Sequence, residues 1–242
     1  MKKILITNDD GITSDGLIRL AREALRFGEV WLVAPDGQRS AASHSITLHS
    51  HIDVYPHDFP VPGVHAFSCS GTPGDCVRVG SLSIMDRKPD LVLSGINYGY
   101  NAASDIQYSA TAGAAFEGCF QGILSIALSE GACACHEVTD AYLHQVIEEQ
   151  IQKPFLPGQI INVNFPDCPL SECKGVLEGR TVSVGTFYRD EYRELEKLPG
   201  DGVRLIVNGK YNEDAESDTD FHAIVNGWVS IGYVSNVGFG NV

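Results

Sequence analysis

Short apolar runs alternate with helix-like patterns through the first half of the chain, and this alternation constrains the fold more than any other feature. Residues 4–6 and 30–34 are continuous apolar runs of the kind that forms buried strands. The segment between them carries apolar residues at helical spacing and ends at Gly28, a helix stop signal. Two strands joined through a helix in this way pair in parallel. The pattern therefore predicts an α/β fold, Rossmann-like and doubly wound, built on a mainly parallel sheet.

Further elements continue this alternation along the chain. Thr72, Pro73 and Asp75 combine a capping hydroxyl, a proline in the first turn and an early acid, which together predict a helix start. Apolar runs and helical spacing later in the chain predict additional elements of both kinds. We expect strands at residues 91–93, 125–128 and 160–163, and helices over residues 111–122 and 143–151.

The sequence pattern changes between about residue 181 and residue 218, where charged residues and tyrosines replace the alternating strand-like and helix-like segments. We expect this stretch to leave the main sheet as a C-terminal hairpin arm or an oligomerisation element. The acidic residues 213–220 within and beyond it predict a solvated loop. The whole chain is then expected to be one domain, with a core of about residues 1–180 and 219–235.

Composition excludes some partners and indicates a compartment. A formal net charge of −14 argues against a protein that binds nucleic-acid polymers or membrane surfaces, because both need basic patches. Seven cysteines without a signal-peptide pattern or a membrane-length apolar run predict a reduced, cytoplasmic protein. The sequence Cys133-Ala134-Cys135-His136 has no second Cys/His pair at zinc-site spacing, so we expect thiols at a loop or helix edge.

Two adjacent carboxylates follow the first apolar run directly. Asp9 and Asp10 are expected at the carboxyl end of a strand, where open α/β sheets bind ligands. Successive strand side chains point to opposite faces, so the two acids converge only if the backbone turns there, and Gly11 supplies the necessary freedom. Because the two charges repel each other, a divalent cation is their simplest partner.

Two other loops are expected at the same edge of the sheet. Residues 39–45 follow the second strand and include Ser40, and residues 94–101 follow a later strand and include Asn97. Carboxylates, a hydroxyl and an amide carbonyl form an oxygen-rich set that suits Mg²⁺ or Mn²⁺ better than zinc or copper. Taken singly, Ser40 could instead cap a turn and Asn97 could occupy a left-handed turn position.

The motifs along the chain resemble those of the SurE family, the stationary-phase survival proteins that are metal-dependent 5′/3′-nucleotidases. They occur in order, at matching spacing, over most of the sequence. The segments that carry the resemblance are residues 6–11, 34–36, 39–40, 44–47, 71–77, 94–97, 108–109, 162–164 and 219–223, with Thr111, Ala114, Ala115, Glu117 and Gly118.

The resemblance implies a SurE-like fold and one divalent cation, Mg²⁺ or Mn²⁺, per subunit. It also implies hydrolysis of nucleoside 5′- and 3′-monophosphates and, in some members, of other phosphomonoesters or short polyphosphate. A homodimer or homotetramer is implied as the assembly. The implied metal ligands are Asp9, Asp10, Ser40 and Asn97, and Asn101 and Ser109 match residues that line the phosphate site.

Physical arguments agree with a phosphate site next to the acid pair. Ser109 and Thr111 precede a small-residue helix, whose free amides and positive dipole end attract anions. His44 either donates a proton to the leaving group or is a loop histidine hydrogen-bonded to a neighbouring serine. Either Asp9 or Asp10 is a candidate general base. The predicted catalytic residues are Asp9, Asp10, Asn101 and Ser109, and the predicted substrate contacts are Asn8, His44, Gly95, Asn101, Ser109 and Thr111.

The chain departs from the family pattern at several positions. Ala110 stands where a glycine is usual, and residues 101–105 lack an expected glycine and one acid. Leu124 replaces a common proline, and the end of the chain lacks the usual Thr-Pro-Leu and the helical tail. These departures concern substrate range and the oligomer contact, because all four predicted metal ligands are present.

Other protein classes fit the sequence less well. A phospho-receiver module needs an acid at the end of its third strand, where this chain has Ser94 and Asn97. A haloacid-dehalogenase-like phosphatase separates its two carboxylates by two positions, whereas Asp9 and Asp10 are adjacent. A dinucleotide dehydrogenase would need a Gly-x-Gly-x-x-Gly turn after the first strand. A phosphate- or metal-binding protein without catalytic activity is the remaining alternative.

Overall fold

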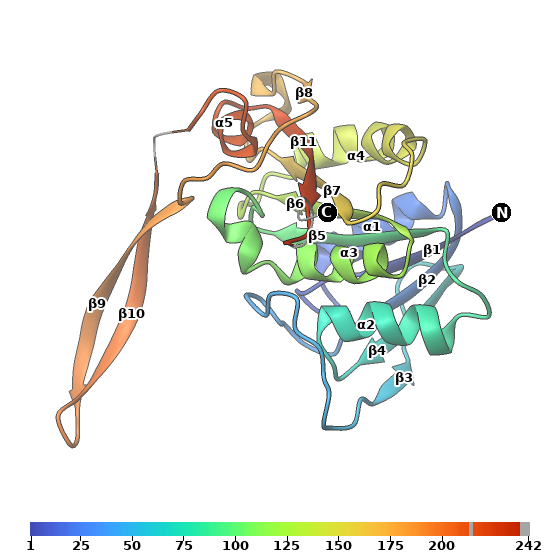
Figure 1. The fold of residues 1–242 in the computed structure, drawn as a ribbon, viewed down its shortest axis with the longest axis horizontal. Helices are drawn as coiled ribbons and strands as arrows, with labels where there is room; N and C mark the ends of the chain where they lie inside the picture. Colours follow the sequence, from blue (N-terminus) through green and yellow to red (C-terminus); the bar gives the residue numbers. More distant parts are fainter. Residues whose placement is uncertain (213–214, 238–242) are drawn as a thin grey trace.

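The computed structural model describes residues 1–212 and 215–237 (Figure 1). Its α-helices are α1 (Asp15–Ala24), α2 (Pro73–Val79), α3 (Ala110–Phe120), α4 (Glu137–Gln150) and α5 (Asp220–Val225). Its strands are β1 (Lys2–Thr7), β2 (Gly28–Pro35), β3 (Val54–Pro56), β4 (Val64–Cys69), β5 (Leu91–Tyr98), β6 (Leu124–Glu130), β7 (Gln159–Phe165), β8 (Val176–Leu177), β9 (Tyr188–Leu198), β10 (Gly202–Tyr211) and β11 (Val229–Ser235). Short turns of other helix types are η1 (Gly80–Ile84), η2 (Ala103–Gln107) and η3 (Leu170–Glu172).

Nine strands form one sheet in the order β3-β4-β2-β1-β5-β6-β7-β11-β8. Strand β1 is central and pairs in parallel with β2 on one side and with β5 on the other. Antiparallel pairing occurs between β3 and β4 and between β7 and β11. The predicted α/β fold with a mainly parallel, doubly wound sheet is confirmed.

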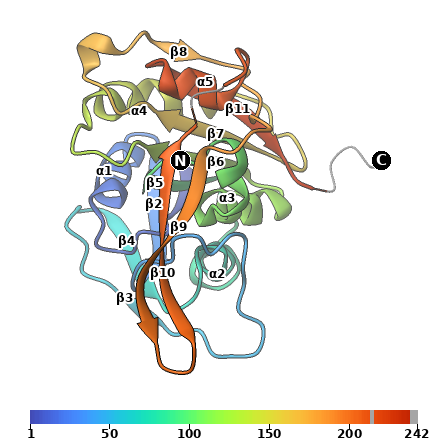
Figure 2. The same ribbon diagram turned by 90° about the vertical axis from the view of Figure 1, so that its left-hand side faces the viewer.

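Helices cover both faces of this sheet, α1 and α4 on one face and α2 and α3 on the other (Figure 2). Alternate side chains of β1 explain the two layers, because Ile4 and Ile6 pack with α1 while Leu5 packs with α2 and α3. Both apolar faces are thus buried, and the carboxyl ends of the parallel strands are left as the place for a site.

Thr72, the capping residue predicted from the sequence, and Ser109, for which no capping role was predicted, set where two of these helices begin. The Thr72 hydroxyl accepts a hydrogen bond from the Asp75 amide at 3.1 Å, and the Asp75 carboxylate accepts one from the Thr72 amide at 2.9 Å. This capping box starts α2. Ser109 caps α3 in a similar way, since its hydroxyl accepts from the Ala112 amide at 2.9 Å.

Within the described residues, strands β9 and β10 pair with each other and with no other strand, and they project from the body of the molecule (Figure 1). The C-terminal hairpin excursion of the predicted fold is therefore confirmed. The predicted solvated loop over residues 213–220 is wrong at its end, because Asp220 is buried and begins α5. Its carboxylate accepts hydrogen bonds from the Ser183 and Ala103 amides. Residues 213 and 214 of that loop lie outside the described residues.

In the described part of the chain, we find no helix with the length and apolar character needed to span a membrane.

Candidate active site

Asp9 is a buried carboxylate at the end of β1. Only 3% of the residue is exposed, and the Thr111 hydroxyl of α3 donates a hydrogen bond to its Oδ1 atom at 2.7 Å. Burial raises the pKa of Asp9 to about 6, with a further increase from the Asp10 charge, against the lowering effect of the Thr111 hydrogen bond. The site thus holds a carboxylate whose negative charge lacks a full counterion.

Asp10 lies beside Asp9, where the chain leaves the strand. Gly11 takes a φ of +99°, which a residue with a side chain rarely adopts, so the predicted turn is present. The Tyr98 amide at the end of β5 donates to Asp10 Oδ2 at 3.0 Å. Burial raises the pKa of Asp10, the Tyr98 hydrogen bond lowers it, and the Glu130 charge raises it again. Two neighbouring strand ends are therefore joined through this acid.

Asn97 reaches the same edge from β5. Its Nδ2 group donates to the Gly99 carbonyl at 2.8 Å, which fixes the amide plane and keeps Oδ1 available as an oxygen ligand. The β5–β6 register shifts between Ser94 and Asn97, next to Gly95. A Cβ atom at Gly95, where φ is +140°, would lie 2.2 Å from the Leu128 carbonyl oxygen. Gly95 thus permits the close approach of β6.

A cavity of about 310 Å³ brings together half of the ten predicted site residues. Five of its lining residues belong to the predicted catalytic, metal and phosphate sets, namely Asp9, Ser40, Asn97, Asn101 and Ser109; the others are Ala41, Tyr98, Tyr100, Asp105 and Tyr108. We call this space the acid cavity. Asp10 lines a neighbouring cavity of about 310 Å³, which shares Tyr98 with the acid cavity and also contacts Glu130 and His136.

Asn101 is held by residues of β7 and β6. Its backbone amide donates to Asn164 Oδ1 at 2.9 Å, and its carbonyl accepts from the side-chain amides of Asn162 and Asn164. Its own Nδ2 group donates to the Ser129 hydroxyl at 2.7 Å. The sequence indicates that Asn162 and Asn164 share one face of a strand, because they are two positions apart, but it does not show that both hydrogen-bond to Asn101.

The structure changes the interpretation of three predicted substrate contacts. Thr111 is fully buried and bonds Asp9, so it orients a carboxylate instead of lining the acid cavity. Asn8 is also buried, and its Nδ2 group donates to the Gly11 carbonyl and the Ser14 hydroxyl. Gly95 packs against β6. None of the three lines the acid cavity.

His44 has a partner that neither sequence-based alternative named. Its Nε2 atom lies 3.1 Å from Glu117 Oε2, and its ring packs at 5.2 Å from that of Phe120. It lines a cavity of about 320 Å³ that shares Ser109 with the acid cavity. The predicted hydrogen bond to a serine is replaced by this pairing with a carboxylate on α3.

Two departures from the family pattern differ in their structural effect. Ala110 is the first residue of α3 and has an ordinary helical backbone, so a glycine is not needed there. Ala103, in the segment that lacks the expected glycine, has a φ of +50°. This left-handed conformation costs an alanine about 1–2 kcal/mol. The hydrogen bond from its amide to the buried carboxylate of Asp220, at 3.1 Å, holds it in place.

The oxygen donors at the acid cavity, together with Asp10 of the neighbouring cavity, fit a hard divalent cation. Asp9 and Asp10 offer carboxylates, Ser40 a hydroxyl and Asn97 an amide carbonyl, which are the oxygen ligands of Mg²⁺ and Mn²⁺. A buried carboxylate with a raised pKa gains from a neighbouring cation. Among residues 1–212 and 215–237, no group of three or more His, Cys, Asp or Glu side chains is placed to hold a metal ion, so a cation at this site would also need the Ser40 and Asn97 oxygens.

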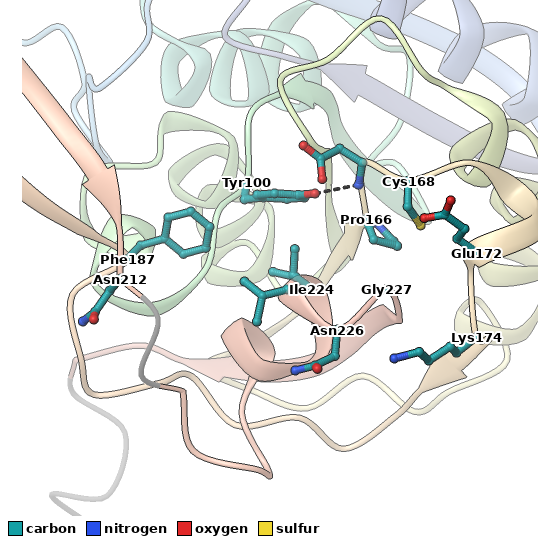
Figure 3. Close-up of a pocket in the computed structure, with 12 residues that line it drawn as sticks. Tyr100, Pro166, Cys168, Glu172, Lys174, Phe187, Asn212, Ile224, Asn226 and Gly227 are labelled. Carbon is teal, nitrogen blue, oxygen red and sulfur yellow. Dashed lines mark hydrogen bonds between the residues drawn. The ribbon is translucent and has the colours of Figure 1, made fainter.

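A larger cavity of about 820 Å³ lies at the base of the hairpin (Figure 3). It is lined by parts of α5, of the segment after β7 and of the chain before β9, and it shares Tyr100 with the acid cavity. The Tyr100 hydroxyl accepts a hydrogen bond from the Asp167 amide at 2.7 Å (Figure 3). This space contains none of the predicted site residues, so size alone does not identify the site.

Comparison with known proteins decides the family. The family model described as "Survival protein SurE" matches residues 4–186. The chain belongs to the SurE family. A protein of Vibrio cholerae serotype O1 named "5'-nucleotidase SurE" is 37% identical over 231 residues, which cover 95% of this chain and 89% of that protein.

Other members agree with this assignment. A Rhodospirillum rubrum protein of the same name is 37% identical over 238 residues, covering 95% of this chain and 88% of the relative. The crystal structure of the SurE protein from Aquifex aeolicus superposes with a TM-score of 0.82 at 31% identity, covering 96% of this chain and 93% of that chain. The resemblance and the SurE-like fold predicted from the motifs are both confirmed.

Proposed function

We propose that this SurE family member is a 5′-nucleotidase, a phosphomonoesterase that hydrolyses nucleoside 5′-monophosphates to nucleoside and phosphate. The observation that carries the proposal is the acid cavity, where the buried Asp9 lies with Asn97, Asn101 and Ser109 at the carboxyl end of the sheet. The relatives named 5'-nucleotidase support the same activity. Hydrolysis of 3′-monophosphates and of short polyphosphate belongs to the proposal as an extension to related substrates.

We also propose that the enzyme uses one divalent cation per subunit, Mg²⁺ or Mn²⁺, held by Asp9, Asp10, Ser40 and Asn97. When bound, such a cation polarises a phosphoryl oxygen and lowers the pKa of a water molecule. The Thr111 hydroxyl occupies Oδ1 of Asp9 and the Tyr98 amide occupies Oδ2 of Asp10. The second oxygen of each carboxylate is then the one offered to the cation or to the attacking water.

Ser109 and Asn101 are proposed to receive the phosphate. The Ser109 hydroxyl caps α3, an eleven-residue helix whose first amides carry partial positive charge toward the acid cavity. Asn101 is held rigidly through its backbone by Asn162 and Asn164, which positions its side chain at the cavity wall. A preorganised anion site of this kind stabilises the negative charge on the phosphoryl oxygens in the transition state.

The test uses purified protein with AMP, GMP and p-nitrophenyl phosphate in Mg²⁺ and Mn²⁺. We expect phosphate release from AMP that EDTA abolishes and that Asp10→Asn loses while the protein keeps its fold by circular dichroism. Asp58→Asn, which changes an exposed acid after β3, is the matched control and should remain active. Inactivity of the parent protein on all three substrates would refute the proposal. A trapped phospho-aspartate would favour the covalent phosphatase alternative.

The assembly and location are proposed on separate grounds. Leu195, Val203, Leu205 and Val207 of the projecting hairpin are exposed, and an isolated two-stranded hairpin is only marginally stable in water. We therefore propose that β9 and β10 contact another copy in a homodimer or homotetramer, with the chain as one domain and about residues 181–218 as its arm. The seven free thiols support a reducing, cytoplasmic location.

A further inference from the structure

Two tyrosines with exposed side chains lie at the acid cavity. Tyr98 is 56% exposed and Tyr108 is 62% exposed, and both line the same space as Asp9 and Ser109. We propose that their rings stack on the base of the substrate, so that the site selects nucleotides over phosphomonoesters without an aromatic group. This inference rests on the proposed phosphatase function and adds the residues that distinguish its substrates.

The backbones of both tyrosines are fixed by the catalytic loops. The Tyr98 amide donates to Asp10 Oδ2 at 3.0 Å, and the Tyr108 carbonyl accepts from the Ser43 amide at 3.0 Å. Tyr108 directly precedes Ser109, the cap of α3. The backbone of each tyrosine is therefore held next to the acid pair or the phosphate position, and the ring reaches the substrate by rotation about its side-chain bonds.

The acid cavity has two kinds of lining, a nearly buried polar wall and the two exposed tyrosine rings. Asp9, Asn97, Asn101 and Ser109 are nearly buried polar residues that suit a cation and a phosphate. A volume of about 310 Å³ is at the lower end for a small-molecule site. We place the phosphate and sugar within it, and the base against the exposed aromatic surface.

Exposed tyrosines elsewhere do not have this setting. Tyr55, on the edge strand β3, is 64% exposed and lines neither the acid cavity nor its neighbours. Exposure is thus common to all three residues, whereas proximity to the acid pair distinguishes Tyr98 and Tyr108. Every base presents a flat π face, so stacking selects for nucleotides without choosing among bases.

The test compares two substrates that differ by the base. We would measure kcat/KM for AMP and for ribose 5-phosphate in the parent protein and in Tyr98→Leu, Tyr108→Leu and the double variant. Each single variant is expected to lower the AMP to ribose 5-phosphate ratio about tenfold, which corresponds to about 1.4 kcal/mol and agrees with base stacking. The loss should appear in KM, and Tyr→Phe at each position should restore the ratio.

Tyr55→Leu is the matched control and should leave the ratio unchanged. An equal loss on both substrates, or no loss on AMP, would overturn the stacking proposal. Calorimetric titration with AMP gives a second readout that does not need turnover. A parent protein that is inactive on both substrates but binds AMP through the tyrosines would refute the proposed function alone, whereas AMP binding unaffected by both substitutions would refute stacking alone.

Discussion

Asp9→Asn should stabilise the metal-free protein while it destroys the activity. Burial raises the pKa of Asp9 from 3.8 to about 6, so the folded protein resists ionisation of this group. A difference of about two pKa units corresponds to about 3 kcal/mol. An asparagine keeps an oxygen for the Thr111 hydroxyl and carries no charge, so it removes this cost at neutral pH.

The sign of the pH dependence follows from proton binding. Between about pH 4 and pH 6 the folded state keeps the Asp9 proton that the unfolded chain has lost, so the free energy of unfolding falls as pH rises. Above about pH 6 both states are ionised and the loss is complete. The stability advantage of Asp9→Asn should therefore grow by about 3 kcal/mol from pH 4 to pH 7.

Urea unfolding in EDTA, followed by circular dichroism at each pH, measures this difference. Asp58→Asn controls for the removal of one negative charge from an exposed position. Addition of Mn²⁺ at 100 times its dissociation constant should raise the stability of the parent protein by about 2.7 kcal/mol and leave Asp9→Asn nearly unchanged. A stability difference that is the same at pH 4 and pH 7 would refute the reasoning about the buried charge.

Two further substitutions test single contacts. Thr111→Val removes the hydroxyl that donates to Asp9, and it should weaken Mn²⁺ affinity or activity about 10- to 100-fold, measured as phosphate release against metal concentration. Thr111→Ser keeps a hydroxyl and should retain both, and an unchanged metal requirement in Thr111→Val would contradict the orienting role. Asp90 accepts hydrogen bonds from Arg87 and the Lys3 amide, and the Arg87 interaction is the main cause that lowers its pKa to about 2. The lowered pKa means that ionised Asp90 stabilises the folded state, and this stabilisation is present above about pH 4 and is lost as the pH falls through 2. Since the Asp90 side chain is 39% exposed, its contribution to the free energy of unfolding should be at most about 1 kcal/mol. In urea unfolding below about pH 4, Asp90→Asn should therefore lose less stability than the parent protein by that amount. An equal loss of stability in both proteins would contradict this prediction.

Local sequence patterns predicted the elements that depend on neighbouring residues. The apolar run of residues 4–6 forms a buried strand because β1 is covered on both faces. Thr72 caps α2 because its hydroxyl reaches the amide three residues ahead. The turn at Gly11 follows from its freedom to adopt a positive φ. The causes of the cap and of the turn lie within a few positions of the residue concerned, whereas the covering of β1 by helices from later in the chain is indicated only by its continuous apolar run.

Contacts across the sheet were not predictable in the same way. Thr111 is near the phosphate position in sequence, but the register of α3 against β1 turns its hydroxyl to Asp9. His44 pairs with Glu117 because the loop after β2 lies against α3. Asp220 has acidic neighbours in the sequence, yet it is buried, and its carboxylate accepts hydrogen bonds from the backbone amides of Ala103 and Ser183 in two distant segments. Such partners depend on how the elements pack, which a single sequence does not encode in any short pattern.

The position of β1 in the middle of the sheet has a consequence during synthesis. Its partner β5 starts at Leu91, and Thr111, which orients Asp9, is later still. At about 5–20 residues per second, the ribosome makes Asp9 and Asp10 several seconds before Asn97 exists. The first βαβ unit is therefore synthesised before Asn97, one of the four proposed cation ligands, is available. A cation held by the proposed ligands would thus bind only after the strands on both sides of β1 are in place.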